Sequence, residues 1–313
     1  MKLVFLDRKS IGDDIDLSPF YAFGDVEEYN FSSLEEIPER VKDADVVIIN
    51  KIPINEQTIG TASHLKLVCV TATGTNNLDK DYLEQRGIAW RNVAGYSTES
   101  VAQHTFAMLF YLMEHLNYYD NYVSNKHYVN DVMFTHFDKQ FHQLSNMTWG
   151  IIGLGAIGRR VADIAKLFGA NVIYYSASGS APQDGYTQVD LDTLLTTSDV
   201  VSIHAPLNEY TEGLINKEAL SKMKSNAILI NVGRGPIVDE LALTNALKNQ
   251  QIAAAGLDVL TVEPMAETNP LVEILDYDNL LITPHIAWAS VEARINLMKI
   301  IEEQIKEFFQ LEN

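Results

Sequence analysis

Residues 147–169 read MTWGIIGLGAIGRRVADIAKLFG, an apolar run followed by a glycine pattern and then by apolar residues at helical spacing. The pattern G-x-G-x-x-G falls on Gly153, Gly155 and Gly158, between the run and the helix. In this context we expect Gly153 to make a tight turn, Gly155 to let a ligand approach the backbone, and Gly158 to let helix and strand pack closely. The stretch therefore predicts a strand–turn–helix unit that binds a dinucleotide.

The first turn of this helix is the predicted phosphate site, because free N–H groups at a helix start attract anions. A glycine-rich turn without a ligand is the alternative, and the strand and helix on either side disfavour it. The residues expected to contact the coenzyme here are Gly153, Gly155, Ala156, Ile157 and Gly158.

Alternating strand-like and helix-like stretches extend from this unit in both directions. Six short apolar runs form one series, at 147–154, 169–176, 199–205, 226–232, 252–259 and 279–285. Four more precede it, at 2–7, 45–50, 65–73 and 88–93. Strands that alternate with helices pair in parallel and are covered on both faces. We therefore predict an α/β protein whose later series forms a Rossmann-type doubly wound parallel sheet.

Three further segments have distinct patterns. Residues 97–113 predict a helix that is apolar on nearly every side, which is typical of a buried helix. Residues 118–148 are rich in aromatic residues, His and Asn, with weak periodicity, and predict an irregular excursion that packs on a partner such as a second subunit. Residues 290–309 predict an amphipathic helix that returns to the first domain.

The charge balance excludes several classes of partner. Lys and Arg number 23 against 42 Asp and Glu, which gives a formal net charge of −19. Such a surface disfavours nucleic acid and anionic membranes, so an anionic substrate needs a local cation. No apolar run approaches the roughly 20 residues that cross a bilayer, and the start of the chain has the pattern of a strand and not of a signal peptide. The single cysteine, Cys69, fits a reducing cytoplasm.

The segment after the run at 169–176 bears on the choice of coenzyme. NAD-binding proteins place an acidic residue there for the ribose hydroxyls, whereas this chain has Ser176 and, two residues later, Ser178. Without the carboxylate a 2′-phosphate is not repelled, yet no Arg follows to pair with it. The sequence therefore leaves the choice between NAD and NADP open.

Three polar motifs follow later strands and suggest the reaction. Arg234, Glu263 and His285 each come after a predicted strand, so they can converge at the carboxyl edge of the sheet. Arg suits the carboxylate of a 2-keto acid because its planar group binds two oxygens at once. His suits proton transfer to the carbonyl oxygen near neutral pH, and Glu would orient the imidazole and stabilise its charged form. Each residue alone has a structural explanation, but the three together predict a catalytic set.

These motifs resemble those of the D-isomer-specific 2-hydroxyacid dehydrogenase family. GLGAIGRRVA, HAPLNEYT, NVGRGPIVDE, AGLDV with a following EP, and TPHIAWAS match the successive motifs of that family in order. The resemblance implies a cofactor domain at 99–286 and a smaller flavodoxin-like α/β substrate domain built from 1–98 and 287–313. It also implies a homodimer, formed partly by the segment after residue 117.

The resemblance implies roles for single residues as well. Arg234 would bind substrate, Glu263 and His285 would form the proton-transfer pair, and Asp258 would bind the nicotinamide carboxamide. Thr73 and Gly74 would present backbone N–H groups to the substrate carboxylate. Further coenzyme contacts are expected at Ser176, His204, Ala205, Pro206, Thr211, Val232, His285 and Ala287. No metal is expected, since the histidines of 115–142 lack ligand spacing.

The most similar branch comprises glycerate dehydrogenases and hydroxypyruvate reductases, on the motif TPHIAWAS with Trp288. A dehydrogenase for a bulkier 2-keto acid remains an alternative. So does a non-catalytic corepressor that senses the coenzyme, because fold alone does not specify function. Glu263 disfavours a formate dehydrogenase, whose relatives have glutamine at that position.

Overall fold

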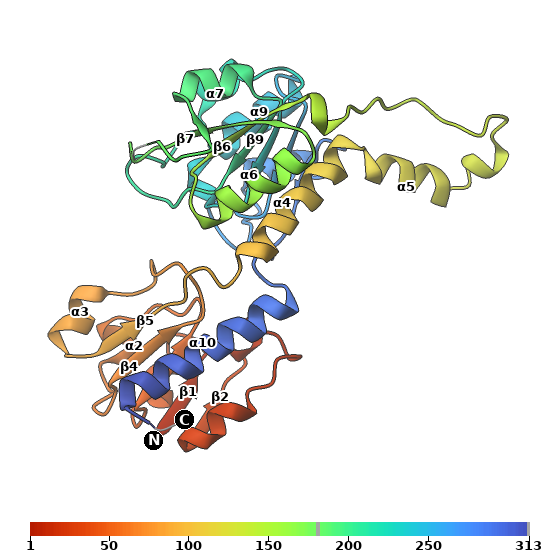
Figure 1. Cartoon of the computed structure of the whole chain (residues 1–313). Coiled ribbons are helices and arrows are strands. Elements are labelled where there is room, and N and C mark those ends of the chain that lie inside the picture. The colour runs from red at the N-terminus through yellow and green to blue at the C-terminus, as the bar shows by residue number, and fades with distance from the viewer. Residues whose placement is uncertain (180–181, 312–313) are drawn as a thin grey trace. The chain divides into compact units, whose positions relative to one another are not determined.

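The computed structural model describes residues 1–179 and 182–311. The chain forms two compact units (Figure 1). One comprises Met1–Ser97 with the chain from Ala289 onward, and the other comprises Thr98–Trp288. Each unit has its own parallel β-sheet. That the first unit binds the substrate and the second unit binds the coenzyme stays a prediction.

The sheet of the second unit is doubly wound, which confirms the predicted fold class. Its strands follow the order β12-β11-β10-β9-β6-β7-β8, and every pairing is parallel. Chain connections reverse direction between β6 and β9, and ligands bind at such a switch point in open α/β sheets. The strands are β6 (Thr148–Ile152), β7 (Asn171–Tyr175), β8 (Thr187–Gln188), β9 (Val200–Ile203), β10 (Ile228–Asn231), β11 (Ala254–Leu257) and β12 (Leu280–Ile282).

The predicted count of six strands for this sheet was wrong by one edge strand. β8 is only two residues long and pairs with β7 alone. The central strands β6, β9, β10 and β11 are buried almost throughout, as expected for a parallel sheet covered on both faces. Trp149 on β6 is fully buried, and its indole N–H donates to the Ser202 hydroxyl on β9 at 2.8 Å.

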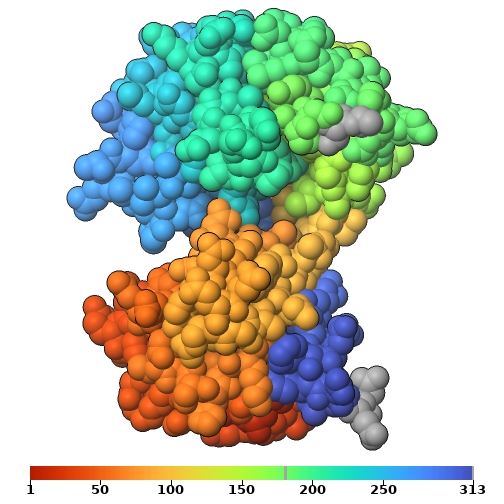
Figure 2. Space-filling view, turned by 90° about the vertical axis from the view of Figure 1, so that its left-hand side faces the viewer, coloured from red at the N-terminus to blue at the C-terminus, as the bar shows by residue number. Residues whose placement is uncertain are grey.

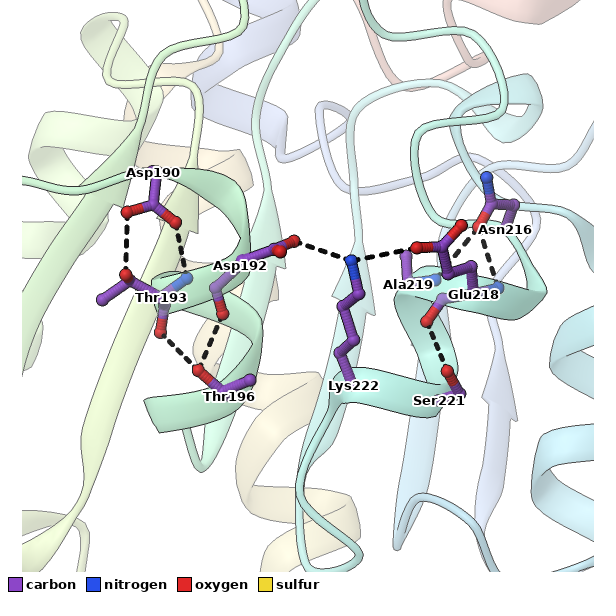
Figure 3. Close-up of polar contacts among 9 residues, drawn as sticks. All are labelled: Asp190, Asp192, Thr193, Thr196, Asn216, Glu218, Ala219, Ser221 and Lys222. Carbon is purple, nitrogen blue, oxygen red and sulfur yellow. Dashed lines mark hydrogen bonds and ion pairs between the residues drawn. The ribbon is translucent and has the colours of Figure 1, made fainter.

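Helices cover this sheet. They are α4 (Thr98–Met113), α5 (Leu116–Ser124), α6 (Ala156–Leu167), α7 (Leu191–Thr197), α8 (Lys217–Lys222) and α9 (Glu240–Lys248). Side chains cap the starts of three of them, α7, α8 and α9. Asp190 caps α7, and Lys222 joins α7 to α8 through ion pairs with Asp192 at 2.9 Å and Glu218 at 3.1 Å (Figure 3). Both acidic partners are exposed, so these pairs add little stability.

The first unit has a five-stranded parallel sheet of order β2-β1-β3-β4-β5, the flavodoxin-like arrangement that was predicted. Its strands are β1 (Lys2–Phe5), β2 (Asp25–Glu28), β3 (Val46–Ile49), β4 (Leu67–Val70) and β5 (Ala89–Arg91). β2 was not predicted, because its sequence DVEE is polar and lies at the edge of the sheet. The helices of this unit are α1 (Ile37–Arg40), α2 (Glu56–Ile59), α3 (Lys80–Gln85) and α10 (Val291–Phe309).

Helix α10 comes from the end of the chain and packs on the first unit. Figures 1 and 2 both show it lying against the N-terminal part of the chain. Arg294 donates to the Ile11 carbonyl at 2.9 Å, and Gln304 donates to the Asn92 carbonyl at 2.9 Å. The unit is thus built from both parts of the sequence. None of the helices in the described part of the chain is both long and apolar enough to cross a membrane.

The segment expected to be irregular is partly helical. α5 begins at Leu116, and short 3-10 helices follow at Tyr128–Asn130 and Leu144–Asn146. The segment projects from its unit in Figure 1. Large apolar side chains between 116 and 141 are exposed, among them Val132 at 96%, Phe134 at 82% and Phe137 at 78%. Further 3-10 helices lie at Arg8–Ser10, Ser18–Phe23, Gly235–Ile237 and Pro270–Ile274.

Candidate active site

Most predicted site residues lie at one edge of the second unit's sheet. All of its strands run parallel, so their carboxyl ends meet at the same edge. The residues that follow these ends are Gly153 after β6, Ser176 after β7, His204, Ala205, Pro206 and Thr211 after β9, Val232 and Arg234 after β10, Asp258 and Glu263 after β11, and His285 and Ala287 after β12.

The glycine turn after β6 has the geometry of a phosphate site. Gly153 has φ +91°, and a Cβ there would lie 2.8 Å from the backbone of Ala205. A Cβ on Gly158 would lie 2.2 Å from the Gly153 carbonyl oxygen, so the helix packs tightly on the turn. A Cβ on Gly155 would meet nothing within 4 Å. The open side of the turn is therefore where a ligand can approach.

Helix α6 begins directly after Gly155, with Ala156 and Ile157 as its first two residues. No side chain caps this helix start, and no acidic residue lies in its first turn. The first N–H groups of the helix and its positive dipole end thus remain available for a phosphate. These residues fit the dinucleotide expected from the sequence.

The segment after β7 carries hydroxyls and, near it, a cation that the sequence analysis missed. The Oγ atoms of Ser176 and Ser178 lie 3.3 Å apart. Arg159 on α6 donates to the Gln183 side-chain oxygen at 2.9 Å, and the Gln183 amide donates to the Leu154 carbonyl at 3.2 Å. A guanidinium is thereby tethered to the glycine turn. Arg159 lies on the helix before β7, so the sequence that follows β7 carries no sign of it.

His204, after β9, is a neutral buried imidazole. Its Nε2 lies 2.9 Å from the Ser202 hydroxyl, which also accepts from Trp149. Burial lowers the pKa of His204 from 6.5 to about 3. Its Nδ1 atom is buried and has no hydrogen-bond partner among the described residues. This histidine is therefore unsuited to proton transfer near neutral pH.

The Thr211 hydroxyl holds the turn that follows His204. It donates to the Pro206 carbonyl at 2.7 Å and accepts from the Asn208 N–H at 2.9 Å. Thr211 is only 1% exposed. Its contacts thus shape the loop after β9, and a direct coenzyme contact by Thr211 stays a prediction.

Arg234 lies in a tight loop after β10. The Asn231 amide donates to the Arg234 carbonyl at 3.0 Å, and its oxygen accepts from the Gly233 N–H at 3.0 Å. The Arg234 side chain donates to the Gly233 carbonyl at 2.7 Å and, within the described part of the chain, makes no ion pair. A half-buried guanidinium without a carboxylate partner can bind an anion from solution.

Asp258 organises the backbone after β12. Its carboxylate is 2% exposed and accepts from the Thr283 hydroxyl at 2.6 Å and from the N–H groups of Ile286 and Ala287 at 2.8 and 2.9 Å. His104 on α4 lies 3.0 Å from the Thr283 hydroxyl. The Asp258 carboxylate thus holds the backbone of the loop that carries His285. A contact between Asp258 and the nicotinamide stays a prediction.

His285 and Glu263 form a close pair. The Nδ1 atom of His285 lies 2.6 Å from the Glu263 carboxylate, and both side chains are less than a third exposed. The other carboxylate oxygen of Glu263 accepts from the Leu260 N–H at 3.0 Å. His285 has a left-handed backbone with φ 55°, and the Trp288 indole donates to its carbonyl at 2.8 Å. His285 is therefore held both through its imidazole ring, by Glu263, and through its backbone, by Trp288.

Thr73 and Gly74 belong to the first unit, in the loop after β4. The Thr73 hydroxyl donates to the Val93 carbonyl at 2.9 Å, and the Asn92 amide donates to the Thr73 carbonyl at 2.6 Å. These bonds fix the loop on the strand beside it. A substrate contact by its N–H groups stays a prediction.

The arrangement is suited to proton transfer beside a bound dinucleotide. Since Nδ1 of His285 faces a carboxylate, that nitrogen carries a proton and Nε2 is the atom that can exchange one with a ligand. Arg234 offers a cation, and the glycine turn offers a phosphate site. The described residues contain no group of three or more His, Cys, Asp or Glu side chains that could hold a metal ion.

Comparison with known proteins gives a consistent result. The family model described as "D-isomer specific 2-hydroxyacid dehydrogenase, NAD binding domain" matches residues 106–287. A protein named putative 2-hydroxyacid dehydrogenase from Haemophilus influenzae is 41% identical over 99% of this chain and 98% of its own length. A glycerate dehydrogenase from Methylorubrum extorquens is 39% identical over 97% of this chain and 93% of its own length.

A solved structure is similar over the same extent. It is an acyclic imino acid reductase in complex with NADPH and D-Arg, and it has a TM-score of 0.87 with 31% sequence identity. The likeness covers 99% of this chain and 97% of that one.

Proposed function

We propose that this chain, which belongs to the D-isomer-specific 2-hydroxyacid dehydrogenase family, reduces a small 2-keto acid to the D-2-hydroxy acid with Arg234, Glu263 and His285 as its catalytic set. Family membership confirms the resemblance inferred from the motifs and makes the chain an oxidoreductase that acts on a CH–OH group with a nicotinamide coenzyme. The observation that carries the proposal is the 2.6 Å contact between His285 and Glu263 at the strand ends that also bear Arg234.

A bound nicotinamide coenzyme supplies the hydride. The glycine turn and the start of α6 would hold its pyrophosphate, because the helix N–H groups are uncapped and Gly155 leaves the approach open. Val232, Asp258 and Ala287 follow neighbouring strands and would line the nicotinamide end. His204, buried and neutral, and Ser176 would lie toward the adenosine end.

Arg234 binds the substrate carboxylate in this mechanism. Its guanidinium can donate two parallel hydrogen bonds, and in a chain of net charge −19 a local cation is needed to attract an anion. From the resemblance alone we also assign backbone N–H groups at Thr73 and Gly74 to the carboxylate.

His285 delivers the proton. Its charged form donates from Nε2 to the carbonyl oxygen as hydride reaches the carbonyl carbon, and the reverse transfer applies in oxidation. The Glu263 carboxylate orients the ring through Nδ1 and balances the positive charge of the imidazolium. The product is then the 2-hydroxy acid, and the imidazole of His285 is left neutral.

The proposed substrate is hydroxypyruvate or glyoxylate, which gives D-glycerate or glycolate. The similarity to a glycerate dehydrogenase at 39% identity supports this choice, together with the motif that contains Trp288. A bulkier 2-keto acid is the alternative substrate, and a corepressor that binds coenzyme without turnover is the alternative function.

Steady-state oxidation of NADH and NADPH tests the proposal with hydroxypyruvate, glyoxylate, pyruvate and bulkier 2-keto acids. We expect the highest kcat/KM with one of the first two. Tight NADH binding without turnover on any of the acids would favour the corepressor. Turnover confined to the bulkier acids would correct the substrate.

Two variants test the residue roles. His285→Ala should lower kcat by about 10² to 10⁴ while NADH binding stays nearly intact, and exposed His64→Ala provides the matched control. Arg234→Lys retains the charge but loses the bidentate geometry, so KM for the keto acid should rise at least about tenfold. An unchanged KM would mean that the carboxylate is bound elsewhere.

The coenzyme is NAD or NADP, and its preference rests on the segment after β7. Ser176 and Ser178 replace the usual acid, and Arg159 lies at the start of α6. Parallel titrations with NADH and NADPH, monitored by nucleotide fluorescence, measure the preference directly.

We further propose a homodimer that covers the exposed apolar segment at 116–141. Val132, Phe134 and Phe137 lie within a stretch of six residues and are strongly exposed, and monomeric proteins rarely expose large apolar patches. Light scattering should give twice the chain mass, and the double variant Phe134→Asp, Phe137→Asp should give the monomer. We place the protein in the cytoplasm, since its single cysteine, Cys69, is buried in β4 and free.

A further inference from the structure

We propose that Glu240 is a positioning residue for the Glu263–His285 pair, an inference that rests on the proposed function. Glu240 is the first residue of α9 and lies six residues after Arg234 in the sequence. It touches neither member of the pair. Its carboxylate instead holds the loop on which Glu263 lies.

Both oxygens of the Glu240 carboxylate bind this loop. Oε1 accepts from the Thr261 N–H at 2.7 Å, and Oε2 accepts from the Asn269 side-chain amide at 2.9 Å. Thr261 lies two residues before Glu263, and Asn269 lies six residues after it. The carboxylate therefore ties together the two ends of the segment that carries Glu263.

The loop has no regular secondary structure, so no strand ladder or helix holds it and side-chain contacts matter more. No helix or strand lies between β11, which ends at Leu257, and the 3-10 helix that begins at Pro270. Asn269 is 9% exposed, and its oxygen caps that 3-10 helix by accepting from the Leu271 N–H at 2.9 Å. The amide is thus oriented with its donor toward Glu240.

The segment that leads to Glu240 holds the same loop from a second point. A Cβ on Gly235 would lie 1.9 Å from the carbonyl carbon of Leu260 and 2.3 Å from the nitrogen of Thr261. Leu260 in turn donates its N–H to the Glu263 carboxylate at 3.0 Å. The path from Glu240 to the catalytic pair therefore passes through Thr261, Leu260 and Glu263.

Only a carboxylate of this length satisfies both donors. An ionised carboxylate accepts a hydrogen bond at each oxygen. A glutamine amide has only one oxygen, so its NH2 group would face either the Thr261 N–H or the Asn269 amide, donor against donor. Aspartate retains the charge but is one methylene shorter, so it cannot reach both ends of the loop. Glutamine thus removes the charge together with one hydrogen bond, whereas aspartate keeps the charge and loses only the reach.

A simpler role for Glu240 is stabilisation of the helix dipole, because it lies in the first turn of α9. Glu218 has that simpler role in α8, where it is exposed and pairs with Lys222 (Figure 3). A dipole contribution changes stability and leaves turnover unaltered. Glu218→Gln is therefore the matched control.

The experiment measures kcat and KM for the keto acid and the Kd for NADH in the full-length protein. Glu240→Gln and Glu240→Asp should each lower kcat about 10- to 100-fold, since a displacement of about 1 Å at a reacting group has that effect. KM and the Kd should change less than about twofold, and Glu218→Gln should match the wild type. Retained NADH binding shows that each variant is folded; if Glu240→Gln fails to bind NADH, Glu240→Asp decides.

The double variant Glu240→Gln, Glu263→Gln identifies the route. If Glu240 acts through Glu263, the double variant should be no slower than Glu263→Gln alone. Multiplied effects would overturn the proposal, as would full activity of Glu240→Asp, which would indicate charge instead of position. Normal kcat in Glu240→Gln with a slow Glu263→Gln rejects this inference alone, whereas normal kcat in Glu263→Gln rejects the proposed function.

Discussion

Acid should destabilise this protein through His204, the buried histidine after β9. Burial lowers its pKa to about 3 in the folded chain, against 6.5 for the unfolded one. Below pH 6.5 the unfolded state therefore binds a proton that the folded state does not bind. The stability contributed by this group is fully present above pH 6.5 and is lost as the pH falls toward 3.

The size of the loss follows from linkage. Only the part of the interval from pH 7.5 to pH 5.0 that lies below the unfolded pKa lowers the free energy of unfolding, and this part spans roughly 1.5 pH units. At about 1.4 kcal/mol per unit, the free energy of unfolding falls by about 2 kcal/mol. For a folding unit of about 200 residues, 1 kcal/mol corresponds to about 2–4 °C in Tm. His204 alone should thus lower the Tm of the second unit by about 4–8 °C over this interval.

Thermal melts of the coenzyme-free protein at both pH values test this reasoning. The variant His204→Gln retains a neutral group that can reach the Ser202 hydroxyl but does not titrate. Between the two pH values, we expect the Tm of this variant to change by about 4–8 °C less than the Tm of the wild type. His64→Gln, at an exposed position, is the control and should behave as the wild type does. Equal pH dependence in the wild type and His204→Gln would refute the assignment of a buried neutral imidazole.

Three other expectations concern single positions. The carboxylate of Asp258 accepts hydrogen bonds from two backbone N–H groups, and the amide of Asp258→Asn would direct a donor at one of them. We therefore expect the free energy of unfolding, measured by melts, to fall by about 2–4 kcal/mol and kcat to be lower. Gly235→Ala adds a Cβ where Leu260 already lies, and should lower kcat while NADH affinity, measured by fluorescence, stays unchanged. Burial raises the pKa of the Cys69 thiol to about 12, so a thiol-specific reagent at pH 8 should react about a thousandfold more slowly with the native protein than with the unfolded one.

The sequence alone determined the fold class and the kind of chemistry. The glycine turn between an apolar strand and a helix, repeated strand–helix alternation, and polar motifs after strands predicted a doubly wound sheet with its ligand edge at the carboxyl ends. These features are local in the chain, because strand runs, turns and motifs each occupy a few consecutive residues. Two of the four edge strands are the exception. β2 and β8 are polar and bond to a single neighbour, so their own sequences do not reveal them.

Only the tertiary structure decided how the candidate site is held. The 2.6 Å contact of His285 with Glu263 joins residues that are 22 positions apart, and the left-handed backbone of His285 is held by Asp258 from another strand end. Arg159 contacts Gln183, and Glu240 contacts Thr261 and Asn269, which are the contacts on which its proposed positioning role rests. Such contacts depend on the packing of distant segments, and loops without a periodic pattern carry no local signal of where their side chains will lie. Residue types therefore predicted the reaction, and three-dimensional packing decided which neighbours position it.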